Sequence, residues 1–336
     1  MSREAEKVKN RWRFPAEWEP QEGVQLTWPH TGTDWAPMLE DILAVYREMA
    51  REIAKRERLL VVAPEDAARD CLRIVCPTND TWARDHGFIS LIDDAGHRRL
   101  LDYHFNGWGE KFEASLDNAI NRRLYELGEI EGEYADCLDF VLEGGAIESD
   151  GKGTVMTTTH CLLAPHRNQP LTKDEIEARL KRDLHAERIL WIDHGNLTGD
   201  DTDGHIDTLV RICPNDTLLY MGCDNPADEQ YEELRLMEEQ LKTFRTLNGK
   251  PYRLLKLPMP EAIYDDGMRL PATYANFLVI NDAVLCPTYG QPAIDAEALR
   301  IIGEAFPGRE IIGIDCCAVI RQHGSLHCCT MQFPKI

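Results

Sequence analysis

The sequence contains no long apolar run. A transmembrane helix needs about 18 or more consecutive apolar residues, and no such stretch is present. The first residues, MSREAEKVKNRWRF, are charged and lack the apolar segment of a signal peptide. We therefore expect a soluble, cytoplasmic protein.

Cysteine spacings typical of a disulfide framework or a metal site are also missing. The 11 cysteines are odd in number, are spread along the chain and include no CxxC pair. The doublets Cys316–Cys317 and Cys328–Cys329 lie near His323 and His327, which leaves a zinc site as an alternative. Adjacent cysteines match no common zinc spacing, so we expect most cysteines to be small buried residues.

Basic residues are few compared with acidic ones. The chain has 37 Lys and Arg against 58 Asp and Glu, a formal net charge of −21. This charge disfavours binding to nucleic-acid phosphates or to an anionic membrane. It would attract a small cationic substrate, although solubility alone is a sufficient reason for a net charge.

The chain also lacks internal linkers and low-complexity tracts, so we expect a single domain over residues 1–336. Within it, five amphipathic helices are predicted from apolar residues that recur at three- and four-residue spacing. These patterns cover residues 38–55, 115–127, 173–185, 228–246 and 294–305. Thr172 followed by Glu175 is a capping-box signature at the start of the third.

A repeating unit surrounds each helix. A short apolar run follows every helix and predicts a buried strand, and two strand patterns joined by a turn precede four of the five helices. Pairing GVQLTW near residue 23 with SLHCCTMQF near residue 325 supplies the fifth pair. We therefore predict an α/β fold of five strand–strand–helix–strand modules, closed into a ring by the two chain ends. A doubly wound parallel sheet is the alternative, which the paired strands disfavour.

Candidate catalytic residues stand just before these strand pairs. Asp85 precedes the second module, Glu143 the third, and Cys328 lies in the strand predicted at the chain end. His205 and Asp207 are two residues apart on a predicted strand, where they would share a face as an acid/base pair. In a closed ring, equivalent positions would converge on one mouth of the central axis. A metal site built from Asp201, Asp203, His205 and Asp207 is an alternative that matches neither calcium-loop nor zinc spacing.

A cysteine, a histidine and several carboxylates in one pocket suit guanidinium chemistry. Asp85 and Asp207 could accept hydrogen bonds from the N–H edges of a planar cation. A thiolate at Cys328 could attack the guanidinium carbon, a histidine could protonate the departing ammonia, and water could hydrolyse the amidino-cysteine without a metal or organic cofactor. Nearby carboxylates should raise the pKa of Cys328. We therefore hypothesise a thiol in the free enzyme that deprotonates once the cation binds.

Six motifs together resemble the agmatine deiminase and bacterial-type peptidylarginine deiminase family, within the guanidine-modifying superfamily. They are WPH (28–30), NDTWARDHG (79–87), LEGGAIESDGKGT (142–154), DTDGHIDTLVR (201–211), YANF (274–277) and GSLHCCTMQ (324–332). The resemblance implies a five-module α/β-propeller, the pentein fold. It also implies the residue roles, with Cys328 as nucleophile, His205 as general acid/base, Asp85 and Asp207 as guanidinium carboxylates, Trp82 and Glu143 as pocket residues, and Asp201 as a further contact at the mouth.

The chain end departs from the family's usual pattern, which puts the substrate's distal end in question. A glycine-rich run is typical there, whereas here His323 precedes the single Gly324. We expect hydrolysis of agmatine, with free arginine or peptidyl arginine as alternative substrates. Amidino transfer and a non-catalytic guanidine-binding protein remain the other hypotheses. A homodimer is expected only because dimers are the commonest oligomers.

Overall fold

The computed structural model describes residues 11–67 and 73–336. Its strands form five small mixed sheets and one separate hairpin. Each sheet has the same core, in which the first strand is antiparallel to the second and the second is parallel to the third. A parallel pair needs a long crossover, and a helix occupies that crossover in every module.

The elements of the first two modules lie close to the predicted ranges. The first comprises β18 (Thr330–Pro334), β1 (Gln21–Thr27), α1 (Leu39–Ala54) and β2 (Arg58–Ala63), extended by β3 (Ile74–Val75). The second comprises β4 (Ile89–Ile92), β5 (Arg98–His104), α4 (Ile120–Glu126) and β6 (Glu133–Val141). The predicted pairing of the chain ends is therefore confirmed, with Leu26 opposite Thr330.

The remaining three modules repeat this order. The third comprises β7 (Glu148–Ser149), β8 (Thr154–Thr158), α6 (Lys173–Asp183) and β9 (Arg188–Ile192). The fourth comprises β10 (Val210–Cys213), β11 (Thr217–Met221), α7 (Tyr231–Thr243) and β12 (Arg253–Leu257). The fifth comprises β15 (Leu278–Ile280), β16 (Ala283–Thr288), α8 (Pro292–Ala305) and β17 (Glu310–Asp315).

Helix boundaries follow local signals in the sequence. The capping box before α6 is confirmed, because the Thr172 side chain accepts from the Glu175 backbone N–H and the Glu175 side chain accepts from the Thr172 N–H. In α1, the apolar stripe buries Ile42, Tyr46 and Met49 completely against the core. The helices thus form where one apolar face can pack on a sheet.

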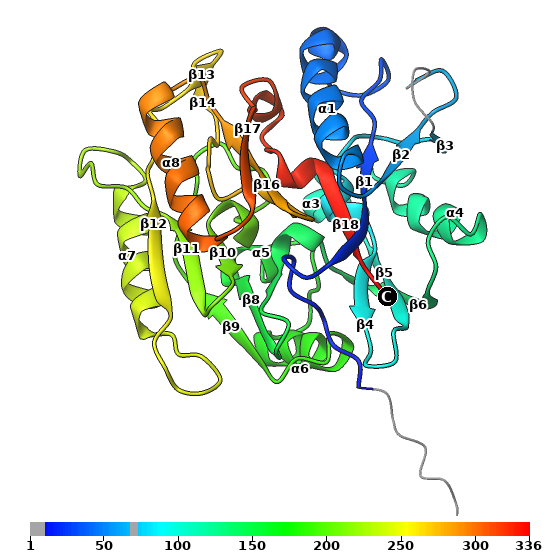
Figure 1. Cartoon of the computed structure of the whole chain (residues 1–336), viewed down its shortest axis with the longest axis horizontal. Helices are drawn as coiled ribbons and strands as arrows, with labels where there is room; N and C mark the ends of the chain where they lie inside the picture. Colours follow the sequence, from blue (N-terminus) through cyan, green and yellow to red (C-terminus); the bar gives the residue numbers. More distant parts are fainter. Residues whose placement is uncertain (1–10, 68–72) are drawn as a thin grey trace, which may run out of the picture.

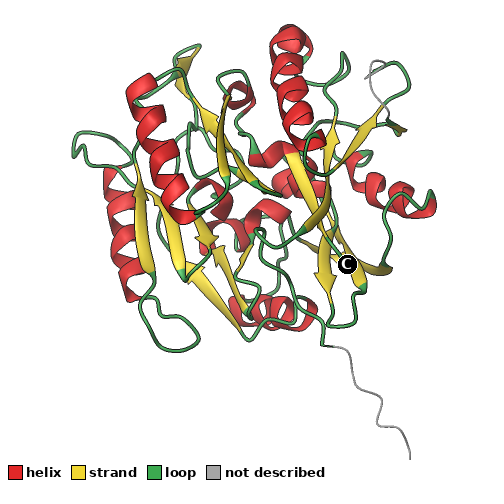
Figure 2. Cartoon of the chain, in the orientation of Figure 1, coloured by secondary structure: helices red, strands yellow, loops and turns green. Residues whose placement is uncertain are grey.

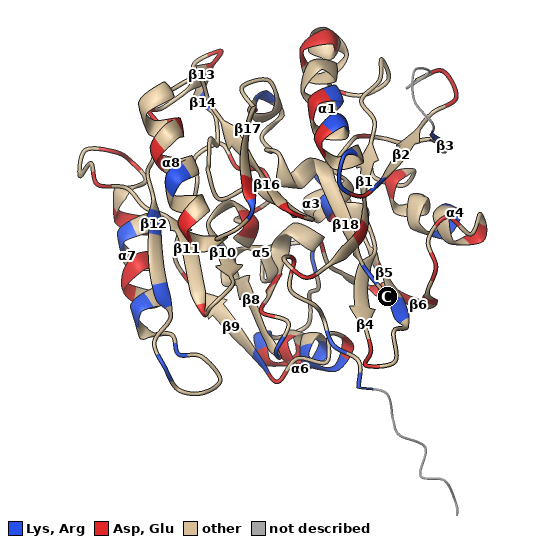
Figure 3. Ribbon diagram, viewed as in Figure 1, with Lys and Arg blue, Asp and Glu red and all other residues tan. Residues whose placement is uncertain are grey.

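The long helices lie on the outside of the molecule and the strands toward its centre (Figures 1 and 2). Around the view of Figure 1 they follow in the order α1, α4, α6, α7 and α8. Charged residues gather on these helices and on the loops, while the inner strands contain few of them (Figure 3). None of the helices in the described ranges has the length and apolar character needed to cross a membrane.

Two expectations about local structure were wrong. His205 and Asp207 do not lie on a strand, because His205 caps the 3-10 helix η4 (Ile206–Thr208) that contains Asp207. Cys328 lies in another 3-10 helix, η6 (His327–Cys329), and strand β18 begins only at Thr330. The hairpin of β13 (Tyr264–Asp265) and β14 (Met268–Arg269) is an addition to the repeat that the strand patterns did not predict.

Candidate functional site

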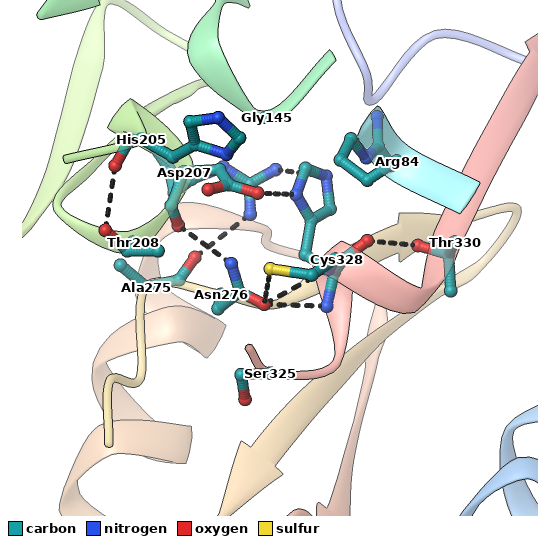
Figure 4. A network of polar contacts seen from close by, with 12 residues as sticks. Arg84, Gly145, His205, Asp207, Thr208, Ala275, Asn276, Ser325, Cys328 and Thr330 are labelled. Atoms are coloured by element: carbon teal, nitrogen blue, oxygen red, sulfur yellow. Dashed lines mark hydrogen bonds and ion pairs between the residues drawn. The ribbon is translucent and has the colours of Figure 1, made fainter. Parts of the chain in front are cut away.

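Five short segments converge at the site, and each stands directly before the first strand of a module. They carry Asp85 in α2 (Ala83–His86), Gly145 in η3 (Gly144–Ala146), Asp207 in η4, Asn276 before β15, and Cys328 in η6. Figure 4 shows His205, Asp207, Asn276 and Cys328 around one centre. The convergence predicted for four of the modules therefore extends to the fifth through Asn276.

Cys328 lines a cavity of about 190 Å³ together with Asp85. The Asn276 side-chain oxygen accepts from the backbone N–H of His327 at 2.9 Å and lies 3.4 Å from the Cys328 sulfur. Burial raises the pKa of the Cys328 thiol well above its ordinary value, and the carboxylates of Asp207 and Asp85 raise it further. Cys328 is therefore a thiol in the free protein at neutral pH.

The neighbouring Cys329 has a different environment. Its sulfur contacts the backbone oxygen of Ser325 at 3.5 Å, and burial raises its pKa to about 12. It does not line the cavity that reaches Cys328. Of the ten described cysteines, all free thiols, only Cys317 is not fully buried, which confirms that most are small core residues; Cys71 lies outside the described residues.

His205 faces Asp85 across Gly145. Its Nδ1 lies 3.6 Å from Oδ1 of Asp85, and both side chains are buried. A methyl group added at Gly145 would lie 2.6 Å from Nδ1 of His205, 3.0 Å from Asp85 and 3.2 Å from Asp207. Only glycine leaves room for these three side chains to meet at one point.

Protonation of His205 is favoured by its surroundings. Burial acts to lower the pKa of His205, but the attraction of Asp85 and smaller contributions from Cys161 and Glu143 outweigh it and raise the pKa well above its ordinary value. Burial raises the pKa of Asp85 to about 6, so the carboxylate is ionised at neutral pH. His205 and Asp85 therefore form a buried imidazolium–carboxylate pair.

In each of the two central carboxylates, Asp85 and Asp207, one oxygen is bound by a neighbouring side chain. The indole N–H of Trp108 donates to Oδ2 of Asp85 at 2.9 Å. Oδ2 of Asp207 lies 2.6 Å from Nδ1 of His327, whereas Oδ1 has no hydrogen-bond partner among the described residues. Burial acts to raise the pKa of Asp207, but His327 outweighs it and brings the pKa below its ordinary value.

Glu143 lies close to His205 and forms a fully buried ion pair with Arg167. One oxygen accepts from Nε of Arg167 at 2.8 Å, and the other has no partner in the described chain. Glu143, Cys161 and His205 also lie close enough together to suit a metal ion. The Arg167 cation and the protonated His205 would repel a metal ion at this position. Asp203, one ligand of the alternative metal site considered from the sequence, forms ion pairs with Arg167 and Lys111 instead.

Trp82 and Asp201 line the cavity that reaches Cys328. Gly324 packs so tightly on Trp82 that a Cβ there would lie 2.2 Å from the ring. Asp34, Asp80 and Asp201 line the same cavity with Phe112 and His323. Within the part of the chain that is described, no Lys or Arg lines this cavity. The lining of the cavity is therefore acidic and aromatic.

Sequence reasoning identified five residues that meet at the site and two that line its wall. It missed Asn276, although YANF was among the motifs, because no role follows from an asparagine alone. Its position before the first strand of the fifth module is the signal that could have found it. Trp108 and Arg167 carried no signal, because their contacts depend on loops far apart in the chain.

Comparison with known proteins identifies the relatives of this chain. The family model described as Porphyromonas-type peptidyl-arginine deiminase matches residues 13–334. A protein of Selenomonas ruminantium with the provisional name agmatine deiminase is 34% identical over 96% of this chain and 96% of its own length. These matches span almost the whole sequence.

Solved structures give the same family. A C. jejuni agmatine deiminase with substrate bound has a TM-score of 0.90 at 36% identity, over 99% of each chain. A Porphyromonas gingivalis protein provisionally named arginine deiminase has a TM-score of 0.90 at 50% identity, over 96% of this chain and 98% of its own. A dimethylarginine dimethylaminohydrolase shares the fold alone, with a TM-score of 0.52 at 13% identity. This chain belongs to the Porphyromonas-type peptidyl-arginine deiminase family of guanidino-group hydrolases.

Proposed function

We propose that this chain hydrolyses the guanidinium group of agmatine, releasing N-carbamoylputrescine and ammonia through a covalent amidino-cysteine. We also propose that residues 1–336 form one domain whose five modules close as an α/β-propeller of the pentein type. The antiparallel pairing of β18 with β1, which joins the two chain ends in one sheet, supports that closure.

The arrangement of Asp85 and Asp207 around Gly145, beside a cavity that Asp85 and Cys328 both line, is the observation that carries this function. The two carboxylates lie on either side of Gly145, where both can accept hydrogen bonds from the N–H groups of a planar cation. The unpartnered Oδ1 of Asp207 is a free acceptor for such an N–H group. Cys328 lines the same cavity as Asp85, which brings its sulfur to the substrate carbon.

In the proposed first half-reaction, the bound cation offsets the negative field of the carboxylates and Cys328 releases its thiol proton to solvent water. The sulfur then bonds to the guanidinium carbon and forms a tetrahedral adduct. The protonated His205 gives its proton to the leaving nitrogen, the carbon–nitrogen bond breaks, and ammonia departs. The raised pKa of His205 supports this role as general acid.

In the second half-reaction, His205 is neutral and acts as general base. It takes a proton from water, and the resulting hydroxide attacks the amidino carbon. The carbon–sulfur bond breaks, the hydroxyl proton of the adduct passes to the sulfur and restores the Cys328 thiol, and the ureido product is released. Glu143 and Trp82 orient the substrate in this proposal, and Asp201 contacts its far end.

The acidic lining of the cavity favours agmatine over arginine. Agmatine carries an ammonium at its distal end, which Asp34, Asp80 or Asp201 would attract. The carboxylate of free arginine, or of a C-terminal peptidyl arginine, would meet like charges and no Lys or Arg among the described lining residues. The name of the P. gingivalis relative favours a second candidate, a citrulline-forming arginine deiminase.

Ammonia release from agmatine, arginine and a C-terminal arginine peptide tests both candidates. We expect release from agmatine, its loss in Cys328→Ala, and its retention in the matched Cys329→Ala variant. Preference for arginine or the peptide would replace agmatine by the second candidate. Transfer of the amidino group to added glycine would show an amidinotransferase. No ammonia release from any of the three substrates would favour a guanidine-binding protein.

A further inference from the structure

His327, the residue before Cys328, lies between two buried carboxylates. Its Nδ1 is 2.6 Å from Asp207, and its Nε2 is 2.8 Å from Oε2 of Glu17. Glu17 comes from the N-terminal segment before β1, more than three hundred residues away in the sequence. All three side chains are at most 9% exposed. An N-terminal residue is thus linked through one ring to a proposed guanidinium carboxylate.

The geometry defines the protonation state of this ring. An ionised carboxylate can only accept hydrogen bonds, so a ring flanked by two of them must donate from both nitrogens. Burial acts to raise the pKa of Glu17, but His327 and Arg211 outweigh it and hold the pKa below the usual range. The charged neighbours of Asp207 hold its pKa below the ordinary value as well. With a carboxylate at each ring nitrogen, the contacts favour a ring that donates from both.

The charges around the ring act in both directions. Nη2 of Arg211 lies 3.3 Å from Nε2 of His327 and opposes a charge on the ring, but Oε2 of Glu17 lies 2.8 Å from each of these nitrogens and compensates both. The charged groups around the ring are Asp207, Glu17, Glu148, Arg211 and Arg84. Three carboxylates and two guanidinium groups leave one negative charge, which the imidazolium neutralises.

Glu17 is fixed by more than this one contact. Its Oε1 accepts from the backbone N–H of Val279 in β15 at 2.8 Å, while Oε2 accepts from Arg211 of β10. Arg211 is in turn bound by Glu148 of β7. Three modules and the N-terminal segment therefore set the position of the carboxylate that faces His327.

We propose that Glu17 is a positioning residue that keeps His327 doubly protonated, and that His327 thereby holds Asp207 ionised and oriented for the guanidinium. This role rests on the proposed function, since it acts through Asp207. The imidazolium directs Oδ2 of Asp207 away from the substrate and leaves Oδ1 for it.

The direct test is ¹⁵N NMR of the histidine rings in the free, full-length protein, with the His327 signals assigned by their loss in His327→Gln. We expect both ring nitrogens of His327 to carry a proton in the wild type at pH 7, as the two carboxylate contacts require. In Glu17→Gln, one ring nitrogen should be without its proton at the same pH, because an amide oxygen accepts a hydrogen bond without stabilising the cation equally. A neutral His327 ring in the wild type at pH 7 would overturn the proposal without reference to any substrate.

Kinetics supply the second readout. In Glu17→Gln, KM for agmatine should rise about tenfold, the size expected for weakening one charge-assisted contact, with a smaller change in kcat. Glu19→Gln is the matched control, because Glu19 binds Arg13 on the same segment and not His327. Equal KM values and equal ring signals in Glu17→Gln and Glu19→Gln would contradict the role of Glu17. A wild type that has a doubly protonated His327 ring but no activity with agmatine would contradict only the proposed function.

Discussion

The indole of Trp108 reaches Asp85 because the backbone from Gly107 to Glu110 is left-handed. All four residues have positive φ, with Trp108 at 57°. A bulky residue in this region is uncommon and costs free energy that the surrounding contacts must supply. The Asn106 side chain accepts from the Gly109 N–H at 2.9 Å and closes the turn. The strained turn thus serves one hydrogen bond to a carboxylate of the site.

Replacing Trp108 by Phe keeps a ring and removes the N–H donor. The pKa of Asp85, about 6 in the wild type, should then rise, because the donor stabilises the charged form. Substrate binding requires the carboxylate, so the acidic limb of kcat/KM should move to higher pH. We expect a loss on the order of tenfold at pH 7.

A pH profile of kcat/KM checks this shift. Trp191→Phe is the control, because its indole donates to Glu177 at 2.8 Å, away from the site, and its loss should leave the profile unchanged. An acidic limb in Trp108→Phe that coincides with the wild type would show that Asp85 does not govern binding.

Gly145→Ala should inactivate the protein without unfolding it. The new Cβ would overlap His205 at 2.6 Å and crowd both carboxylates, and displacing reacting groups by about 1 Å can cost on the order of 100-fold in rate. Gly303→Ala in α8 is the control, since its Cβ meets only ordinary contacts. Steady-state kinetics and circular dichroism would check both, and near wild-type kcat/KM in Gly145→Ala would contradict this account of the site.

At the scale of elements, loops rather than long helices hold the site. Arg167, in the loop after α5 (Thr159–Leu162), binds Glu143 before η3 and also contacts Asp203 and the Thr202 backbone oxygen before η4. One guanidinium therefore ties together the loops of two neighbouring modules. Its side chain is fully buried, so its removal would leave the Glu143 charge without a partner.

We expect Arg167→Met to destabilise the fold by about 3–5 kcal/mol, the usual cost of removing one partner of a buried ion pair. Urea unfolding would measure this loss. Arg182→Met is the control, because its pair with Asp183 is exposed and should contribute less than about 1 kcal/mol. Equal unfolding midpoints for the two variants would mean that Glu143 gains water or another donor.

The sequence patterns predicted the long elements well and the short ones poorly. All five amphipathic helices form near their predicted bounds. Four of them are eleven or more residues long and α4 has seven, which is enough for a clear apolar stripe in the sequence. The 3-10 helices η4 and η6 have three residues each, too few for any periodicity. A polar pair such as His205 and Asp207 before an apolar strand therefore resembled the strand itself.

At the scale of the whole molecule, the repeat and the chain ends could be predicted, while the contacts between modules could not. The pairing of β1 with β18 followed from two strand patterns that lacked partners. The Glu17–His327 and Trp108–Asp85 contacts join segments whose closeness depends on how the modules pack. Motif positions thus located the catalytic candidates, and only the structure supplied their supporting residues.

The net charge of −21 should accelerate capture of a cationic substrate. Raising ionic strength from about 20 mM to about 500 mM shortens the screening length severalfold, so kcat/KM for agmatine should fall while kcat stays nearly constant. Initial rates of ammonia release at a series of NaCl concentrations would measure the change in kcat/KM. A kcat/KM independent of salt would assign the charge to solubility alone.

Mass spectrometry of the protein quenched in acid during turnover of agmatine tests the central claim most directly. We predict a mass gain equal to agmatine less ammonia, located on the peptide that contains Cys328 and absent from Cys328→Ala. The adduct should accumulate in His205→Ala if ammonia can still leave, because hydrolysis lacks its general base. Ammonia release from the wild type with no adduct under any quench, or with an adduct on another cysteine, would contradict nucleophilic catalysis by Cys328.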